Sequence, residues 1–468
     1  MDTMHSHVPN IFASAILNPV GPTKSEYIAR GALTVLPDGS IGSVGSLDAA
    51  IEKFPRALVH RLAPGALIIP GLIDCHTHLP QLDAAGRFDE SLLEWLEGHI
   101  FPLEQRFADP DFAQKRARTF MEELVRSGTT TANVMVTVHE RATDIAFGEA
   151  KRAGLRAIIG KVMMDRNSPP ELKESTEEAI EASRRLILRW RDQAPGRLMY
   201  ALCPRFAPSC STRLMRDAGR IARDLSVRIH THISETTDEV GMVRREFPHA
   251  HSYAEVYDQA GLLSPLTLLA HGVYLTDPER QLIAQRGSSI AHCPSSNLFL
   301  RSGLMDVPRT SSFGIAVGLG SDVGGGPVLD LFQTMGMACY NSKALRLGTE
   351  GVAQGRREPQ LFTPLNAFYS ATLGGSKALG LATTVGSLET GKRADFVVID
   401  MAQLCPEGFD ATSVDAETVA SLLAYRSRGR SVRASFVDGE LTHFNSEELA
   451  NLADAEEGSP DKTNPARI

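Results

Sequence analysis

The long middle of the chain alternates short apolar runs, typical of strands, with stretches of helical periodicity. The apolar runs end near residues 74–76, 130–133, 160–164, 201–205, 229–232, 268–271, 290–293 and 317–322, and helical patterns such as 112–127 and 176–193 separate most of them. This alternation predicts a parallel sheet, and eight strand–helix units predict an α/β fold of the (β/α)8 barrel type. An open doubly wound sheet would need a glycine-rich loop after its first strand. The sequence His-Thr-His-Leu-Pro at 76–80 does not provide one.

Two shorter β segments flank this middle part. Near the start, residues 32–36 are apolar and Pro37-Asp38-Gly39-Ser40 follows as a turn; residues 394–400 and 432–439 show a similar pattern near the end. Because chain ends often lie close together, we expect these segments to pair in a small composite β-sandwich. The expected organisation is 1–68 for the first part of the sandwich, 69–380 for the barrel, 381–445 for the return, and a mobile polar tail at 446–468.

Composition and charge exclude several classes of protein. The 48 basic and 56 acidic side chains give a net charge of −8, which argues against a nucleic-acid partner. The first residues lack the pattern of a signal peptide, and no apolar run is long enough to span a membrane. None of the six cysteines forms a CxxC pair, which argues against a zinc ribbon or a thioredoxin-like site. We expect a protein of the reducing cytoplasm.

Metal-ligand side chains gather at the predicted strand ends, where barrel enzymes carry their catalytic residues. The apolar run that begins at Ala66 is expected to continue as one buried strand to His76 and His78, which point to the same side. The other candidates are His232 on the fifth strand, His271 on the sixth and Asp322 on the eighth. Imidazole nitrogens and a carboxylate oxygen suit a metal such as zinc, and three histidines with one acid would leave a position open for water.

Glu235 follows His232 by three residues. That spacing would place its carboxylate over the cavity without making it a ligand, where it could act as general acid and base beside a metal-activated water.

Each histidine also has a plainer interpretation. A single histidine near a strand end is more often a packed core residue, and we expect this of His230, one layer deeper than His232. His292 is an intermediate case. Five suitable ligands at the ends of four strands of one predicted barrel are hard to explain by chance.

With these features the chain resembles the amidohydrolase superfamily. Residues 70–78 resemble its first-strand signature, and residues 386–395 resemble the return into its sandwich. Within the superfamily, the chain is similar over nearly its whole length to the members that deaminate guanine. The runs that support this are 160–165, 204–211, 232–235, 270–275, 292–298 and 318–326.

The resemblance implies roles for individual residues. It implies that His76, His78, His232 and Asp322 hold one zinc ion per chain, although the same ligands accept iron. His271 would lie beside metal and substrate, Glu235 would shuttle protons, and Gln81, Arg205 and Phe206 would hold the purine. The fourth strand carries no lysine that could bridge two metals. The family also suggests a homodimer.

The chemistry of Arg205 agrees with this assignment. A guanidinium can donate two hydrogen bonds to O6 and N7 of guanine, whereas adenine presents an amino group in place of O6. Phe206 could pack on the ring face. The alternatives are a buried ion pair that holds a loop for Arg205, and simple core packing for Phe206.

The resulting hypothesis is hydrolytic deamination of guanine to xanthine and ammonia by a metal-activated water. The water attacks C2, Asp322 orients it and accepts its proton, and Glu235 protonates a ring nitrogen beside C2, which we expect to be N3. One alternative is a related hydrolase acting on 8-oxoguanine, a pterin or an s-triazine. Another is a non-enzymatic assembly protein on the same barrel, but such relatives typically lose metal ligands that are all present here. A cytidine-deaminase type of site would need a PCxxC segment, which is missing.

Overall fold

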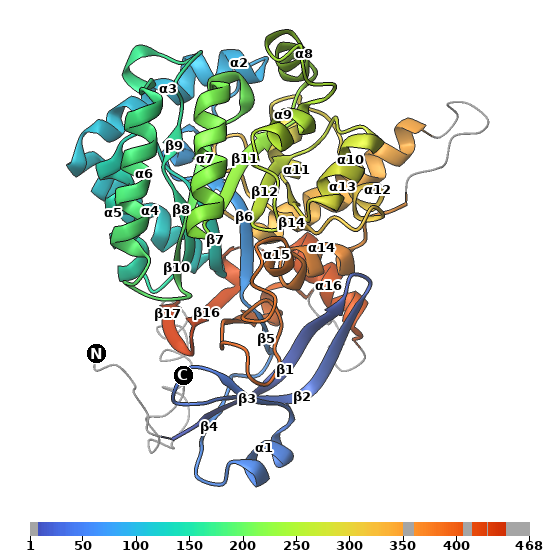
Figure 1. Cartoon of the computed structure of the whole chain (residues 1–468). Helices are drawn as coiled ribbons and strands as arrows, with labels where there is room; N and C mark the ends of the chain where they lie inside the picture. Colours follow the sequence, from blue (N-terminus) through green and yellow to red (C-terminus); the bar gives the residue numbers. More distant parts are fainter. Residues whose placement is uncertain (1–7, 350–359, 406–413, 428, 446–468) are drawn as a thin grey trace.

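The computed structural model describes residues 8–349, 360–405, 414–427 and 429–445; the tail expected at 446–468 lies outside them. Figure 1 shows a barrel with helices around it and, below it, a sheet built from both ends of the chain. The predicted fold class is therefore confirmed.

The barrel consists of eight parallel strands in chain order, as predicted. They are β6 (Leu72–His78), β7 (Thr129–Met135), β8 (Arg156–Gly160), β10 (Leu198–Pro204), β11 (Arg228–Ile233), β12 (Thr267–His271), β13 (Ser289–His292) and β14 (Val317–Leu319). A two-residue strand, β9 (Val162–Met163), extends β8 along β10. Between the last and first strands, the Asp322 amide donates to the His76 carbonyl at 3.0 Å, which brings the two ends together.

Helices connect successive strands around the barrel (Figure 1). They are α4 (Pro110–Arg126), α5 (Glu140–Arg152), α6 (Thr176–Trp190), α7 (Thr212–Leu225), α8 (Thr237–Glu246), α9 (Tyr253–Gln259), α10 (Asp277–Gln285), α11 (Pro294–Phe299) and α12 (Val307–Ser311). The chain continues with α13 (Leu331–Thr349), α14 (Pro364–Ser370), α15 (Leu373–Ala378) and α16 (Ala416–Arg426). The helical patterns at 112–127 and 176–193 correspond to α4 and α6. The latter starts at a capping box in which Ser175 and Glu178 satisfy each other's backbone amides.

The second sheet has eight strands from both ends of the chain, and its hydrogen-bonded order is β17-β16-β15-β5-β1-β2-β3, with β4 on β1. The strands are β1 (Asn10–Gly21), β2 (Lys24–Val35), β3 (Ile41–Ser46), β4 (Leu58–Arg61), β5 (Ala66–Pro70), β15 (Phe396–Asp400), β16 (Val432–Val437) and β17 (Glu440–Phe444). The expected pairing of the two ends is confirmed by antiparallel β15 and β5. The ring centroids of Phe12 on β1 and Phe396 on β15 lie 5.2 Å apart across β5, so these two side chains pack on the same face of the sheet.

One apolar run of the sequence forms two strands rather than the expected single one. It ends as β5 at Pro70 and resumes as β6 at Leu72, so that its two halves belong to different sheets. Gly71 lies between them, and a Cβ atom there would be 1.9 Å from Oγ1 of Thr130. The chain thus crosses from one sheet to the other at a point with no room for a side chain.

A buried cluster of charges joins the barrel to the second sheet. Arg156 on β8 donates from Nε to Asp395 at 2.9 Å and from Nη2 to Asp438 at 2.6 Å. Asp395 precedes β15, and Asp438 lies in the turn between β16 and β17. One arginine therefore ties a barrel strand to the start of β15 and to the turn between β16 and β17.

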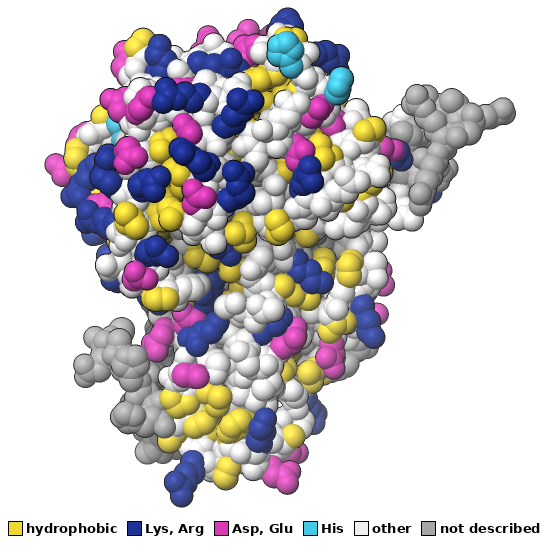
Figure 2. Space-filling view, viewed as in Figure 1, with side chains coloured by type: hydrophobic (Ala, Val, Ile, Leu, Met, Phe, Trp, Pro, Cys, Tyr) yellow, Lys and Arg dark blue, Asp and Glu magenta, His cyan; other side chains and the backbone are white. Residues whose placement is uncertain are grey.

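On the face in Figure 2, basic and acidic side chains are interspersed, and no field of one sign dominates. Among the described residues, no helix is long and apolar enough to cross a membrane.

Candidate active site

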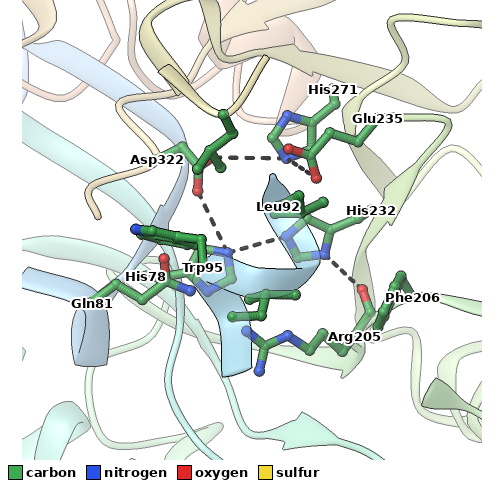
Figure 3. A pocket seen from close by; sticks show the side chains of 12 residues that line it. His78, Gln81, Leu92, Trp95, Arg205, Phe206, His232, Glu235, His271 and Asp322 are labelled. Carbon is green, nitrogen blue, oxygen red and sulfur yellow. Dashed lines mark hydrogen bonds and ion pairs between the residues drawn. The ribbon is translucent and has the colours of Figure 1, made fainter. Parts of the chain in front are cut away.

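The predicted metal ligands meet at the carboxyl ends of the barrel strands. His76 and His78 are the fifth and seventh residues of β6, His232 is on β11, His271 ends β12, and Asp322 follows β14. Figure 3 shows Asp322, His78 and His232 side by side, with His271 next to Asp322. Residues that are up to 246 positions apart in the sequence are thus brought together by strand order alone.

The distances between these groups suit one small cation. Nε2 of His78 lies 3.1 Å from Nε2 of His232, and Asp322 Oδ1 lies 3.2 Å from Nε2 of His76 and 3.6 Å from Nε2 of His78. Ligands bound about 2.0–2.2 Å from one ion at tetrahedral or right angles are about 3.0–3.5 Å apart. Nε2 of His76 is buried without a hydrogen-bond partner in the described part of the chain, as expected of an atom reserved for a ligand bond. The residues present therefore fit a metal ion.

Hydrogen bonds at the other ring nitrogens fix how the imidazoles point. Nδ1 of His76 lies 2.7 Å from Nε2 of His230, and Nδ1 of His232 lies 2.6 Å from the carbonyl oxygen of Arg205. Such bonds hold the ring and leave Nε2 free to bind a metal. His230 is buried one layer deeper, as predicted, but it contacts a candidate ligand instead of only packing in the core.

Burial also sets the protonation states of the candidate metal ligands. It lowers the pKa of His76, and it lowers the pKa values of His78 and His232 well below the usual value, so these rings are neutral at physiological pH. Burial alone would raise the pKa of Asp322, but the neighbouring His76, His271 and His78 outweigh it and hold that pKa well below its ordinary range. Neutral imidazoles and a carboxylate are the forms that bind metals.

A second, overlapping group of possible ligands contains His76, His271, Cys293 and Asp322. Burial raises the pKa of the Cys293 thiol well above its ordinary value, which keeps it protonated and makes it a poor ligand. The His76, His78, His232 and Asp322 set is chemically the better one.

Glu235 lies beside this group, held at both its backbone and its side chain. Glu239, the third residue of α8, accepts hydrogen bonds from the amides of Glu235 and Thr236 as part of the helix cap. Ser302 donates to Oε1 of Glu235 at 3.0 Å, and Oε2 lies 3.6 Å from Nε2 of His271. Burial raises the pKa of Glu235 to about 7, with His271 opposing the shift. Such a carboxyl can give or take a proton near neutral pH.

His271 sits between the two acids. Its Nδ1 lies 2.9 Å from Oδ1 of Asn297, and its Nε2 lies 3.8 Å from Oδ2 of Asp322. Burial would lower its pKa, but Glu235 and Asp322 outweigh burial and raise it. The backbone of His271 is left-handed, with φ +73°, and that of Asp322 is also left-handed, with φ +46°. Such conformations are costly for residues other than glycine and are typical of functional sites.

The three predicted purine contacts line the pocket that His78, His232, Glu235, His271 and Asp322 also line. Gln81 comes from a 3-10 helix, η1 (Leu79–Ala84), directly after β6, and Arg205 and Phe206 follow β10. Arg205 also forms a buried ion pair, 2.8 Å from Nη1 to Oε2 of Glu104. The ion pair considered as an alternative for Arg205 therefore exists together with its position in the pocket.

The apolar part of the pocket wall was not predicted from the sequence. Leu92 and Trp95 of α2 (Leu92–Trp95), Leu96 of the following π-helical turn η2 (Leu96–Ile100), and Leu300 line it. Trp95 is fixed by a hydrogen bond from its indole nitrogen to the carbonyl of Arg87, at 2.8 Å. These elements are too short for a periodic pattern. The available signal was an apolar cluster with a tryptophan in the connection between the first strand and its helix.

Comparisons with known proteins agree with this geometry. Residues 67–442 match the model of the Amidohydrolase family. A guanine deaminase of Escherichia coli (strain K12) is 37% identical over 91% of this chain and 94% of its own length. The structure of guanine deaminase from C. acetobutylicum with guanine bound in its active site is 31% identical and has a TM-score of 0.84, with 92% of this chain and all of that chain covered.

A more distant structure, an adenosine deaminase from Xanthomonas campestris with bound zinc, is 25% identical with a TM-score of 0.79 over 96% of this chain and 97% of that chain. On these matches, and with the metal-ligand group at the strand ends, the chain belongs to the amidohydrolase family and, within it, to the guanine deaminases.

Proposed function

We propose that this protein hydrolyses guanine to xanthine and ammonia. The observation that carries the proposal is that one pocket holds a metal-ligand group, a proton-transfer carboxyl and a guanidinium. The similarity to enzymes named guanine deaminase, one of them solved with guanine bound, selects guanine among the possible bases.

The metal we propose is one zinc ion per chain, held by His76, His78, His232 and Asp322. Their distances fit such an ion, and a zinc-bound relative supports the choice over iron. When bound, the ion would supply a water molecule whose pKa is low enough to give hydroxide near neutral pH.

The part of the pocket lined by Gln81, Arg205 and Phe206 would recognise the base. The guanidinium of Arg205 can donate to O6 and N7 of guanine, and the Gln81 amide can bond a further polar group of the ring. Phe206 and Trp95 offer aromatic surface for the ring faces. A site built to bond O6 would reject adenine, because adenine carries a donor at that position.

The part of the pocket beside the candidate metal ligands would transfer protons. Asp322 would orient the attacking water and accept its proton, and Glu235 would protonate N3. The remaining proton of the added hydroxyl would return to Glu235 as the C2 carbonyl forms, and the C2 amine would leave as ammonia with the proton held by Asp322. Ser302 holds Oε1 of Glu235, which leaves Oε2 on the side of His271 as the oxygen that exchanges the proton. His271 would polarise the group under attack.

We further propose a homodimer in a reducing, cytoplasmic compartment. The homodimer rests on the family, and light scattering would test it. The six cysteines, all within the described residues, are free, and five of them are buried, which agrees with a reducing compartment.

The test is ammonia release from guanine, adenine, cytosine and 8-oxoguanine, with metal analysis of the same sample. We expect release from guanine at least about 100-fold faster than from adenine, given the discrimination possible at a hydrogen-bonded edge. Faster release from 8-oxoguanine would assign the pocket to an oxidised purine. No release from any base would refute the proposal.

A further inference from the structure

Glu104 lies directly behind the guanidinium that faces the pocket. It belongs to α3 (Phe101–Gln105), the helix that follows the wall of Leu92 and Trp95. Its side chain is fully buried, and its Oε2 pairs with Nη1 of Arg205 at 2.8 Å. Glu104 does not line the pocket, so it reaches a ligand only through Arg205.

The charge of Glu104 is balanced by Arg205. Oε1 of Glu104 is buried without a hydrogen-bond partner in the described part of the chain. Burial raises the pKa of Glu104, and Arg205 is the charged group that opposes this shift. The Phe101 ring lies 5.5 Å from the guanidinium carbon and adds an apolar face with a weak attraction for the cation. In such a dry setting, an unpaired charge on either partner would be felt strongly.

We propose that Glu104 determines the charge of the base that this pocket accepts. By neutralising Arg205 and holding one nitrogen of its fork, Glu104 makes the recognition end a donor of hydrogen bonds without a net positive charge. The pocket then takes neutral 6-oxopurines and does not favour anionic ones. This inference rests on the proposed function and adds a specificity-determining residue that acts through Arg205.

The consequence concerns the product. Guanine is neutral near physiological pH, whereas xanthine loses a ring proton in that range and becomes an anion. An unbalanced guanidinium would attract this anion and retain the product. The Glu104–Arg205 pair removes that attraction, so release of product is not slowed by charge.

The experiment compares two ligands that share the O6 and N7 edge, xanthine and hypoxanthine, at a mildly alkaline pH where xanthine is anionic and hypoxanthine is largely neutral. Their dissociation constants are measured by calorimetry on the full-length, metal-loaded chain and its Glu104→Gln variant. We expect this variant to favour xanthine over hypoxanthine by about tenfold more than the unmodified chain, because one negative charge close to the anion is removed.

Two further variants distinguish an effect of the Glu104 charge on ligand preference from general damage to the fold. Arg205→Gln leaves the carboxylate unbalanced, so it should shift the same ratio against xanthine while weakening both ligands. The matched control is Glu149→Gln, a buried carboxylate on α5 that pairs with Arg152 and Arg118 away from the pocket; it should leave the ratio unchanged. Damage to folding would weaken both ligands without moving the ratio in opposite directions. If one of the two variants fails to fold, the other still gives the sign.

Each outcome is decisive. Opposite shifts for Glu104→Gln and Arg205→Gln, or the expected shift in whichever of them folds, support the inference. An unchanged ratio in a folded variant overturns it, even if guanine turnover is normal. If neither purine binds the unmodified chain, the inference fails, whereas the proposed function is judged separately by ammonia release from guanine. If the purines bind and the ratios shift but no ammonia is released from guanine, only the reaction assignment fails.

Discussion

At the scale of single residues, the site depends on neighbours that set charge and direction. Three imidazoles are kept neutral by burial. At His76 and His232 a hydrogen bond at Nδ1 leaves Nε2 free, facing Asp322 in His76 and Nε2 of His78 in His232. Glu235 is the exception, because burial makes its carboxyl titrate near neutral pH, with a pKa of about 7. The same burial therefore suits both proposed roles: it keeps the candidate metal ligands neutral, and it gives Glu235 a pKa suited to proton transfer.

Replacing Glu235 with Gln should abolish turnover while keeping fold and metal. The amide is isosteric and can still accept the Ser302 hydrogen bond, but it cannot carry a proton. General acid–base catalysis is typically worth about 10²–10⁴ in rate, so kcat should fall by at least that factor. Steady-state ammonia release, with metal content and thermal unfolding as controls, measures the effect. Turnover within a few-fold of the unmodified chain would remove Glu235 from the proton transfer.

The sequence indicated residues of the site where chemistry and strand position coincide. The candidate ligands lie at the ends of predicted strands, so their convergence could be deduced from barrel topology. The positions of Glu104 and Trp95 could not be deduced in this way, because neither residue lies at a strand end. Glu104 contributes through its ion pair with Arg205, and Trp95 contributes by lining the pocket. His230 was placed at the right depth, but its contact with His76 depends on ring orientation, which no sequence pattern contains.

At the scale of elements, the barrel strands and major helices followed from periodicity, and the exception is instructive. The apolar run from Ala66 to His78 predicted one strand, with the boundary between sandwich and barrel expected inside it at 68/69, because hydrophobicity alone does not show where the chain changes sheet. The break occurs at Pro70-Gly71, where close packing against Thr130 excludes a side chain. The Pro-Gly pair was the only local sign of it.

Gly71→Ala tests this junction. The new Cβ would meet Oγ1 of buried Thr130 at 1.9 Å, so β6 or β7 must move. Overpacking of this kind typically costs about 1–3 kcal/mol, and we expect the free energy of unfolding to fall by that amount in urea titrations. Gly148→Ala on α5 is the control, since its Cβ would have no atom within 4 Å and alanine favours a helix. Equal stability of both variants would show that the junction can relax.

At the scale of the whole molecule, the second sheet is fixed to the barrel by Arg156, Asp395 and Asp438. Burial would raise the pKa of Asp438, but Arg156 and Arg393 outweigh it and lower that pKa. Because the folded pKa lies below the unfolded one, this pairing stabilises the fold at pH values above the unfolded pKa, about 3.9. The stabilisation is lost as the pH falls through the folded pKa.

Arg156→Gln should therefore destabilise the protein most at neutral pH. Removing one partner of a buried ion pair costs about 3–5 kcal/mol, because Asp395 remains buried without its cation. The deficit should stay nearly constant down to about pH 4 and shrink below it, as the pH falls through the lowered pKa of Asp438. Urea unfolding at several pH values measures it, with Arg393→Gln, a more exposed partner of Asp438, as a milder control. A deficit that does not change with pH would show that packing, not charge, is what Arg156 provides.

The most direct test of the central claim is a titration of metal-free protein with zinc while ammonia release from guanine is recorded. We expect no release without metal, a linear rise up to one equivalent per chain, and a plateau beyond it. Undiminished release from the metal-free protein, or a rise that continues to two equivalents, would contradict a single metal held by His76, His78, His232 and Asp322.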